Sequence, residues 1–279
     1  MAKKILIADD DRATRHLLSS VLKEKGYEVA TAVDGSAALK KLQKEKFDLL
    51  LTDVWMPSMN GLELLARLRQ EPNQPRAVVM TSDDTPEVLL RAVREQAYHY
   101  VRKPVEPAVL VELIKDALAA KPTSPPIEVI SAAPQWIELL VPCELEAISR
   151  ITGFMAQLKS DLPNEDREHV GQAFRELLSN AIEWGGKLDP NQKVRISCIK
   201  TPRMLQYRIA DPGTGFRLED LTHAAISNPV EDPVRHDEVR KAKGLRAGGY
   251  GIYMVRNLVD ELVYNEVHNE VVLIKYLNA

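Results

Sequence analysis

The amino-acid sequence predicts two successive α/β domains of different architecture, and three observations support this. The chain has 279 residues, a length that suits two domains of ~150 residues each. Hydrophobic residues make up 45% and charged residues 28%, which is typical of globular proteins and excludes disordered, collagen-like and coiled-coil chains. The third observation is the order of the expected strands and helices, which alternates strictly up to about residue 120 and changes beyond it.

The first 120 residues predict a doubly wound, five-stranded parallel sheet. Short runs rich in β-branched residues and leucine indicate strands at residues 5–8, 27–32, 48–52, 76–81 and 98–101. Amphipathic stretches separate them; residues 12–25, for example, place Leu18 and Leu22 on one helical face and end at Gly26. Right-handed crossovers between such strands bring their carboxyl ends to one edge of the sheet.

A proline-rich segment separates the two expected domains. Residues 121–126 read Lys-Pro-Thr-Ser-Pro-Pro, and segments of this kind form extended, semi-rigid spacers rather than packed cores. We therefore predict a first domain over residues 1–120, a linker over residues 121–134 and a second domain over residues 135–279.

The second domain has a different order of elements. Strands are expected at residues 136–141, 193–200 and 205–210 and near Leu262 and Val271, and helices at residues 144–160, at 165–184 and from about residue 250. An irregular polar stretch follows the strand that ends at residue 210. This order predicts an α/β sandwich in which helices cover one face of a mostly antiparallel sheet.

Charge, hydropathy and cysteine usage exclude several classes of protein. The formal net charge is −3, from 37 Lys and Arg against 40 Asp and Glu, so no global basic surface is available for nucleic acid. Charged residues interrupt every apolar run before the ~20 residues of a membrane span, and no signal peptide is visible. Cys143 and Cys198 suit free thiols in a reducing compartment. We expect a cytoplasmic protein that binds neither membranes nor nucleic acid directly.

Polar side chains gather at the ends of the expected parallel strands. Asp9 and Asp10 follow the first strand, Asp53 follows the third, Thr81 ends the fourth and Lys103 follows the fifth. Each acid alone would be an ordinary helix cap, but together they favour a site for Mg²⁺, which prefers oxygen ligands. A carboxylate neutralised in this way can attack a phosphoryl group and hold it as an acyl phosphate, while the hydroxyl and the ammonium contact the phosphoryl oxygens.

Four segments of this half resemble response-regulator receiver domains, which have a flavodoxin-like fold. They are residues 5–11 (ILIADDD), residues 53–61 (DVWMPSMNG), Thr81-Ser82 and Lys103-Pro104. The resemblance implies that Asp53 is the phosphoacceptor and that an upstream histidine kinase is the phosphodonor.

The same resemblance assigns the other residues of this site. It implies that Asp10 and Asp53 bind Mg²⁺ directly, that Asp9 acts through water and that the main-chain carbonyl of Trp55 is a further ligand. It also implies that Thr81 and Tyr100 form a switch pair, in which the hydroxyl moves to the phosphoryl group and the ring turns inward. Taken alone, Tyr100 would be a simple aromatic residue at a strand edge.

Three constellations stand out in the second half. Glu176 and Asn180 are four residues apart on one expected helix and therefore share a face. Residues 211–215 read Asp-Pro-Gly-Thr-Gly directly after a strand, where the glycines would allow a ligand close to the backbone. Residues 248–251 read Gly-Gly-Tyr-Gly and open a helix, whose N-terminus suits phosphates. Each signal alone also fits a solvated helix face or a plain turn.

In this order the constellations resemble the GHKL (Bergerat-fold) ATPases, and the anti-sigma-factor serine kinases most closely. The resemblance implies that Asn180 binds Mg²⁺ on ATP, that Asp211 accepts a hydrogen bond from the adenine amine and that Glu176 is the general base. The glycines that it places around ATP are Gly213, Gly215, Gly249 and Gly251.

The resemblance also predicts an ATP lid and shows one departure. Residues 217–247 would form the lid, with basic side chains that could reach phosphates or that simply form a solvated face. Many such kinases have a histidine where this chain has Trp184, so competence to bind ATP is better supported than competence to transfer phosphate.

We weighed three functions against this pattern. A hybrid histidine kinase needs a long dimerisation hairpin before its ATPase domain, and the chain has no room for one. A DNA-binding regulator needs a basic recognition helix after the linker, and none is visible. The leading interpretation is a response regulator whose output is an anti-sigma-like serine/threonine kinase, acting on an antagonist protein, with a sigma factor as alternative ligand and a homodimer as a plausible state. The alternative is an ATP-bound module that sequesters a partner without transfer.

Overall fold

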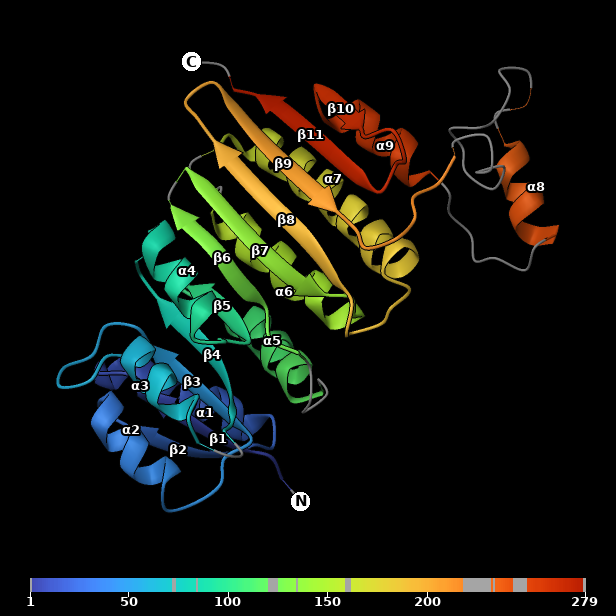
Figure 1. The fold of residues 1–279 in the computed structure, drawn as a ribbon. Helices are drawn as coiled ribbons and strands as arrows, with labels where there is room; N and C mark the ends of the chain where they lie inside the picture. The colour runs from blue at the N-terminus through green and yellow to red at the C-terminus, as the bar shows by residue number, and fades with distance from the viewer. Residues whose placement is uncertain are drawn as a thin grey trace. The chain divides into compact units, whose positions relative to one another are not determined.

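The computed structural model divides the chain into two compact units, Met1–Ser124 and Pro125–Ala279, and each is considered by itself. Figure 1 labels their helices and strands. None of the helices described is both long and apolar enough to span a membrane. The structure describes residues 2–71, 74–83, 85–119, 125–133, 135–158, 162–217, 232, 234–242 and 250–277.

The first unit contains the expected five-stranded parallel sheet, in the order β2-β1-β3-β4-β5. Its strands are β1 (Lys4–Ala8), β2 (Glu28–Ala32), β3 (Leu49–Asp53), β4 (Arg76–Thr81) and β5 (His99–Arg102). Its helices are α1 (Arg12–Glu24), α2 (Gly35–Leu42), α3 (Gly61–Leu68), α4 (Pro86–Arg94) and α5 (Pro107–Ala119). The prediction of this fold is confirmed.

Both faces of this sheet are buried, as the nearly continuous apolar strands require. Ile5 and Ile7 of β1 pack in one core with Leu22 of α1 and Ile114 of α5. Leu6 lies between them on the opposite side of the strand and is also fully buried. The strands are therefore held firmly, and their polar carboxyl-terminal residues are left at one edge.

The second unit contains a six-stranded sheet in the order β10-β11-β9-β8-β7-β6, with every neighbouring pair antiparallel. Its strands are β6 (Glu128–Ala133), β7 (Trp136–Pro142), β8 (Lys193–Lys200), β9 (Met204–Ala210), β10 (Glu261–Tyr264) and β11 (Glu270–Tyr276). Its helices are α6 (Leu145–Gln157), α7 (Asn164–Asn180), α8 (Arg235–Ala242) and α9 (Gly251–Leu258), and a π-helical turn, η1 (Ala181–Gly185), follows α7 directly. The expected antiparallel architecture is confirmed.

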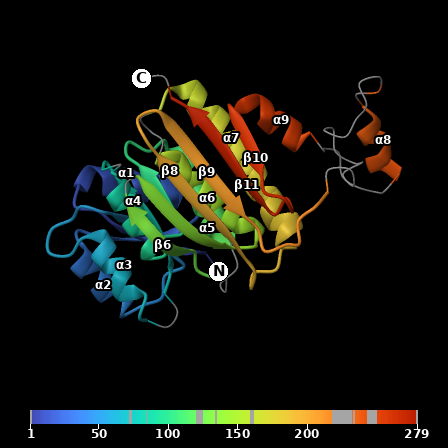
Figure 2. The same ribbon diagram turned by 45° about the horizontal axis from the view of Figure 1, so that its top comes forward.

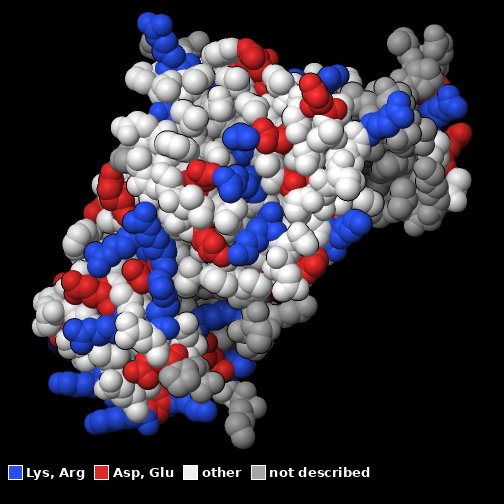
Figure 3. Space-filling view, in the orientation of Figure 1, with Lys and Arg blue, Asp and Glu red and all other residues white. Residues whose placement is uncertain are grey.

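Helices cover one face of this sheet, and none of the described helices of this unit covers the other, which we call the open face. Figures 1 and 2 show α6 and α7 on the same face, where the ring of Phe174 lies 4.7 Å from that of Tyr207 in β9. The open face carries intermingled acidic and basic side chains (Figure 3), among them the ion pair of Arg195 with Glu138 at 2.9 Å.

Two expectations about the second half are wrong. Residues 128–133, within the predicted linker, form β6 and pair with β7. Prolines flank this segment, so its composition resembles a spacer although it forms a short edge strand. Ile127, which precedes the strand, is buried. Residues 235–242, within the stretch expected to be irregular, form α8, a helix whose polar composition gives no apolar face to detect.

Candidate functional site

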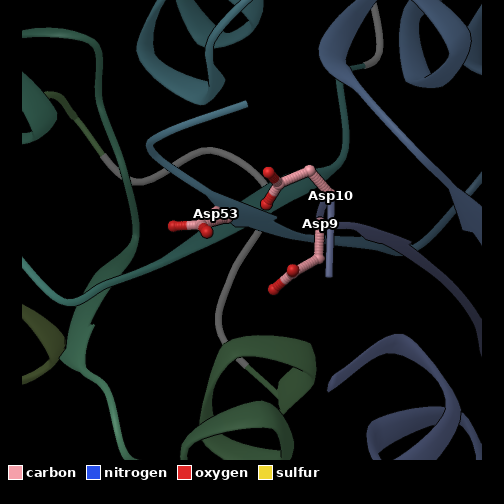
Figure 4. A group of neighbouring side chains, drawn as sticks. All are labelled: Asp9, Asp10 and Asp53. Atoms are coloured by element: carbon pink, nitrogen blue, oxygen red, sulfur yellow. The ribbon is translucent and has the colours of Figure 1, made fainter. Parts of the chain in front are cut away.

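Three carboxylates converge at the edge of the first sheet (Figure 4). Asp9 and Asp10 follow β1 directly and Asp53 is the last residue of β3, and one oxygen from each lies within 4.8 Å of the others. Asp9 and Asp53 are buried, whereas Asp10 is exposed. Three hard oxygen donors at this spacing fit a divalent cation such as Mg²⁺. Asp11, next in sequence, instead accepts hydrogen bonds from the amides of Ala13 and Thr14 and caps α1.

Lys103 compensates the two buried carboxylates. Its Nζ atom lies 2.8 Å from Oδ2 of Asp9 and 2.7 Å from Oδ2 of Asp53. Burial raises the pKa of Asp53, and the hydrogen bond from Lys103 offsets only part of that rise. Burial also acts to lower the pKa of Lys103, but its bonds to Asp53 and Asp9 outweigh this and raise that pKa. The lysine therefore stays charged between two carboxylates, one of which is poorly stabilised as an anion.

A second group of contacts surrounds Asp83, just beyond β4. The amide of Asp83 donates to Oγ1 of Thr81 at 3.1 Å, and the hydroxyl of Tyr100 donates to the carbonyl oxygen of Asp83. The exposed indole of Trp55 donates from Nε1 to Oδ2 of Asp83 at 3.2 Å. The ring of Tyr100 is only 2% exposed, so it already points inward here. Asp83 thus links Thr81, Tyr100 and Trp55.

In the second unit, α7 carries Glu176 and Asn180 on one half-buried face. Gly251 begins α9, and a Cβ atom added to it would lie 1.9 Å from Oε1 of Glu176. Glycine at this position therefore lets the carboxylate approach the start of α9 closely. Among the residues that the structure describes, the side chains of Glu176 and Asn180 make no hydrogen bond or ion pair.

The turn after β9 holds a second carboxylate. The amide of Gly213 donates to Oδ1 of Asp211 at 2.8 Å, and a Cβ atom added to Gly185 in η1 would lie 2.2 Å from Cγ of Asp211. Gly215 has φ of +81°, and a Cβ atom there would lie 1.7 Å from the carbonyl oxygen of Val267. Burial raises the pKa of Asp211, and the bond from Gly213 lowers it by less.

The helix α7 and the turn η1 together border both the start of α9 and the turn after β9. We call α7 and η1 the common wall of the candidate site. Glu176 on α7 contacts Gly251, and Gly185 at the end of η1 contacts Asp211, so the expected catalytic and nucleotide residues border one region. Gly249 lies outside the described residues, as does most of the predicted lid. The sequence analysis did not identify Gly185 because a glycine pair after a helix is an ordinary helix-end signal.

Two family models match the chain: the response regulator receiver domain over residues 5–115 and the histidine kinase-like ATPase domain over residues 141–275. The chain is 32% identical over 226 residues to the DNA-binding response regulator MtrA of Mycolicibacterium smegmatis, covering 78% of this chain and 97% of that protein. It is 31% identical over 206 residues to the DNA-binding transcriptional regulator NtrC of Azospirillum brasilense, covering 73% of this chain but only 42% of that protein.

Solved structures similar to the chain include response regulator receiver domains. A CheY-like response regulator receiver domain protein from Methanospirillum hungatei is 34% identical, with a TM-score of 0.41, over 42% of this chain and 94% of the other. The chemotaxis response regulator CheY4 of Vibrio cholerae is 32% identical, with a TM-score of 0.40, over 42% of this chain and 99% of the other.

Proposed function

Because the chain belongs to the response regulators and its second half matches a histidine kinase-like ATPase domain, we propose that phosphorylation of Asp53 controls an anti-sigma-type serine/threonine kinase in the same chain. The ATPase domain implies ATP binding. The observation that carries the kinase assignment is the common wall of α7 and η1, which sets Glu176 against Gly251 and Gly185 against Asp211.

In the receiver, Asp53 would accept a phosphoryl group from a phosphohistidine of an upstream kinase. Its carboxylate oxygen forms a bond to phosphorus while the phosphorus–nitrogen bond to the histidine breaks. Lys103, already 2.7 Å from Asp53, would contact the phosphoryl oxygens, and the hydroxyl of Thr81 would reach them by leaving the amide of Asp83.

Both sites have residues that suit Mg²⁺. Asp9, Asp10, Asp53 and the carbonyl of Trp55 would hold it in the receiver, and Asn180 in the ATPase domain. When bound, Mg²⁺ neutralises the negative charge of the carboxylates and phosphates.

In the ATPase domain, Asp211 would accept a hydrogen bond from the amino group of adenine, and Gly213, Gly215, Gly249 and Gly251 would allow the nucleotide close to the backbone. Glu176 would accept the proton of a serine or threonine hydroxyl. The hydroxyl oxygen then forms a bond to the γ-phosphorus while the bond between that phosphorus and the bridging oxygen of ADP breaks, and ADP leaves. We propose an antagonist protein as the substrate, a sigma factor as an alternative ligand and a homodimer as the assembly.

We expect Glu176→Gln to slow phosphoryl transfer by about 10²- to 10⁴-fold while leaving ATP affinity within about threefold, because a general base contributes this much to the rate and little to binding. The purified protein is incubated with Mg²⁺, γ-labelled ATP and an extract of its own cells, and acid-stable label on protein is measured. ATP affinity is measured separately by calorimetry.

Glu168→Gln is the matched control, because it makes the same change at an exposed position of the same helix. Loss of ATP binding in Glu176→Gln would contradict its role as a base. If the wild type binds ATP but labels no protein, the kinase interpretation would be wrong, and a module that sequesters its partner would take its place.

The receiver proposal predicts that beryllofluoride with Mg²⁺ changes the fluorescence of Trp55. Movement of Thr81 away from the amide of Asp83 would disturb the hydrogen bond between Asp83 and the exposed indole. The measurement uses a Trp136→Phe, Trp184→Phe background, in which Trp55 is the single tryptophan of the three. An equal change in the same background with Asp53→Asn would show that the signal does not come from this site.

A further inference from the structure

The turn between β10 and β11 contacts the nucleotide turn, residues 211–215, at several points. The side-chain amide of Asn269 donates to the carbonyl oxygen of Gly213 at 3.0 Å, and the amide of Asp211 donates to the carbonyl of Asn269 at 2.9 Å. The amide of Phe216 donates to the carbonyl of Val267 at 3.1 Å. Asn269 therefore contacts the nucleotide turn with both its main chain and its side chain.

The orientation of Asn269 is fixed by a second asparagine. The Nδ2 atom of Asn265 donates to Oδ1 of Asn269 at 2.8 Å, so Nδ2 of Asn269 must face Gly213. The Oδ1 atom of Asn265 accepts from the main-chain amides of Asn269 at 3.1 Å and Glu270 at 3.2 Å. The turn is therefore held internally and can act as a rigid support.

Aromatic packing holds the same turn from the side. The ring of His268 lies 5.2 Å from that of Phe216, just after the nucleotide turn, and 5.4 Å from that of Tyr264 in β10. The turn between β10 and β11 therefore contacts the nucleotide turn and the residue after it through aromatic rings as well as through hydrogen bonds.

We propose that Asn269 is a positioning residue that sets base selectivity. Asn269 holds the carbonyl of Gly213 by a hydrogen bond, and the amide of Gly213 in turn donates to Oδ1 of Asp211. The other carboxylate oxygen of Asp211, Oδ2, is thereby directed at the base. Among the described residues, Oδ2 accepts no hydrogen bond. This inference rests on the proposed role of Asp211 toward the amino group of adenine.

The test compares MgATP with MgITP, in which a carbonyl oxygen replaces that amino group and would face the carboxylate. We expect the wild type to prefer ATP by at least about tenfold, the effect of one charge-assisted hydrogen bond. In Asn269→Asp a carboxylate faces the carbonyl of Gly213, and the two oxygens repel, so the nucleotide turn no longer holds Asp211 in place. We expect ATP binding to weaken about tenfold while ITP binding changes little. Asn269→Ala removes the donor without adding charge and is expected to lose selectivity in the same direction.

Calorimetric dissociation constants distinguish the outcomes. A variant that only destabilises the fold would weaken both nucleotides equally, and unchanged selectivity in both variants would overturn the inference. A wild type that binds ATP and ITP equally would instead overturn the role proposed for Asp211. Gln206→Glu makes a comparable amide-to-acid change on the open face of β9 and is expected to leave both constants unchanged.

Discussion

Replacing Asp211 with asparagine is expected to stabilise the nucleotide-free protein and to weaken ATP binding by about 10- to 100-fold. The loss of affinity follows from removing one charge-assisted hydrogen bond, worth about 1.5–3 kcal/mol, to the amino group of adenine. The gain in stability follows because Asp211 is half-buried beside Gly185, and burial raises its pKa. The hydrogen bond from Gly213 stabilises the buried anion only in part, and the ligand would stabilise it further.

The pH dependence of unfolding tests this explanation. With its pKa raised, Asp211 holds more protons in the folded state than in the unfolded state, so the free energy of unfolding falls as pH rises from the ordinary value of 3.8 through the raised one. The asparagine side chain does not titrate, so it adds no such pH dependence. The stability advantage of Asp211→Asn should be small well below pH 3.8 and largest at neutral pH.

Urea unfolding at several pH values and calorimetric titration with ATP provide both measurements. Glu168→Gln, an exposed acid-to-amide change on α7, should alter stability by less than about 0.5 kcal/mol and leave ATP binding intact. An Asp211→Asn protein that is less stable than wild type at neutral pH would show that the carboxylate holds the turn together instead of straining it.

The first unit could be predicted almost completely because its signals are local and strong. Continuous apolar strands such as residues 5–8 alternate with amphipathic helices, and chain topology then carries the strand ends to one edge. The convergence of Asp9 and Asp53 follows from that topology alone. The double contact of Lys103 does not, because it depends on the length and direction of one side chain.

The second unit was predicted less completely because its decisive contacts join distant segments. Asn269 reaches Gly213 over 56 residues, and nothing near either position in the sequence indicates the pairing. The strand β6 was missed because its flanking prolines resemble a spacer. The turn η1 continues the helical pattern of α7, so its change of hydrogen bonding leaves no trace in the spacing of apolar residues.

Lys103→Met is expected to destabilise the first unit by about 3 kcal/mol at pH 7 in EDTA. Lys103 lies within 2.8 Å of both Asp9 and Asp53, whose side chains are 0% and 11% exposed. Removing one partner of a buried ion pair leaves uncompensated charge, which costs about 3–5 kcal/mol. Methionine retains much of the apolar stem, so the loss should come mainly from charge and not from a cavity.

Urea unfolding is followed by Trp55 in the Trp136→Phe, Trp184→Phe background, so that the signal reports the first unit. Lys115→Met is the matched control: its pair with Glu112 is as short, at 2.7 Å, but both side chains are more than half exposed. Water screens such a pair, so we expect a much smaller loss of stability there than in Lys103→Met. Mg²⁺ should restore part of the stability of Lys103→Met, because a divalent cation can compensate the same carboxylates. Equal losses in the two variants would mean that solvent, and not Lys103, compensates Asp9 and Asp53.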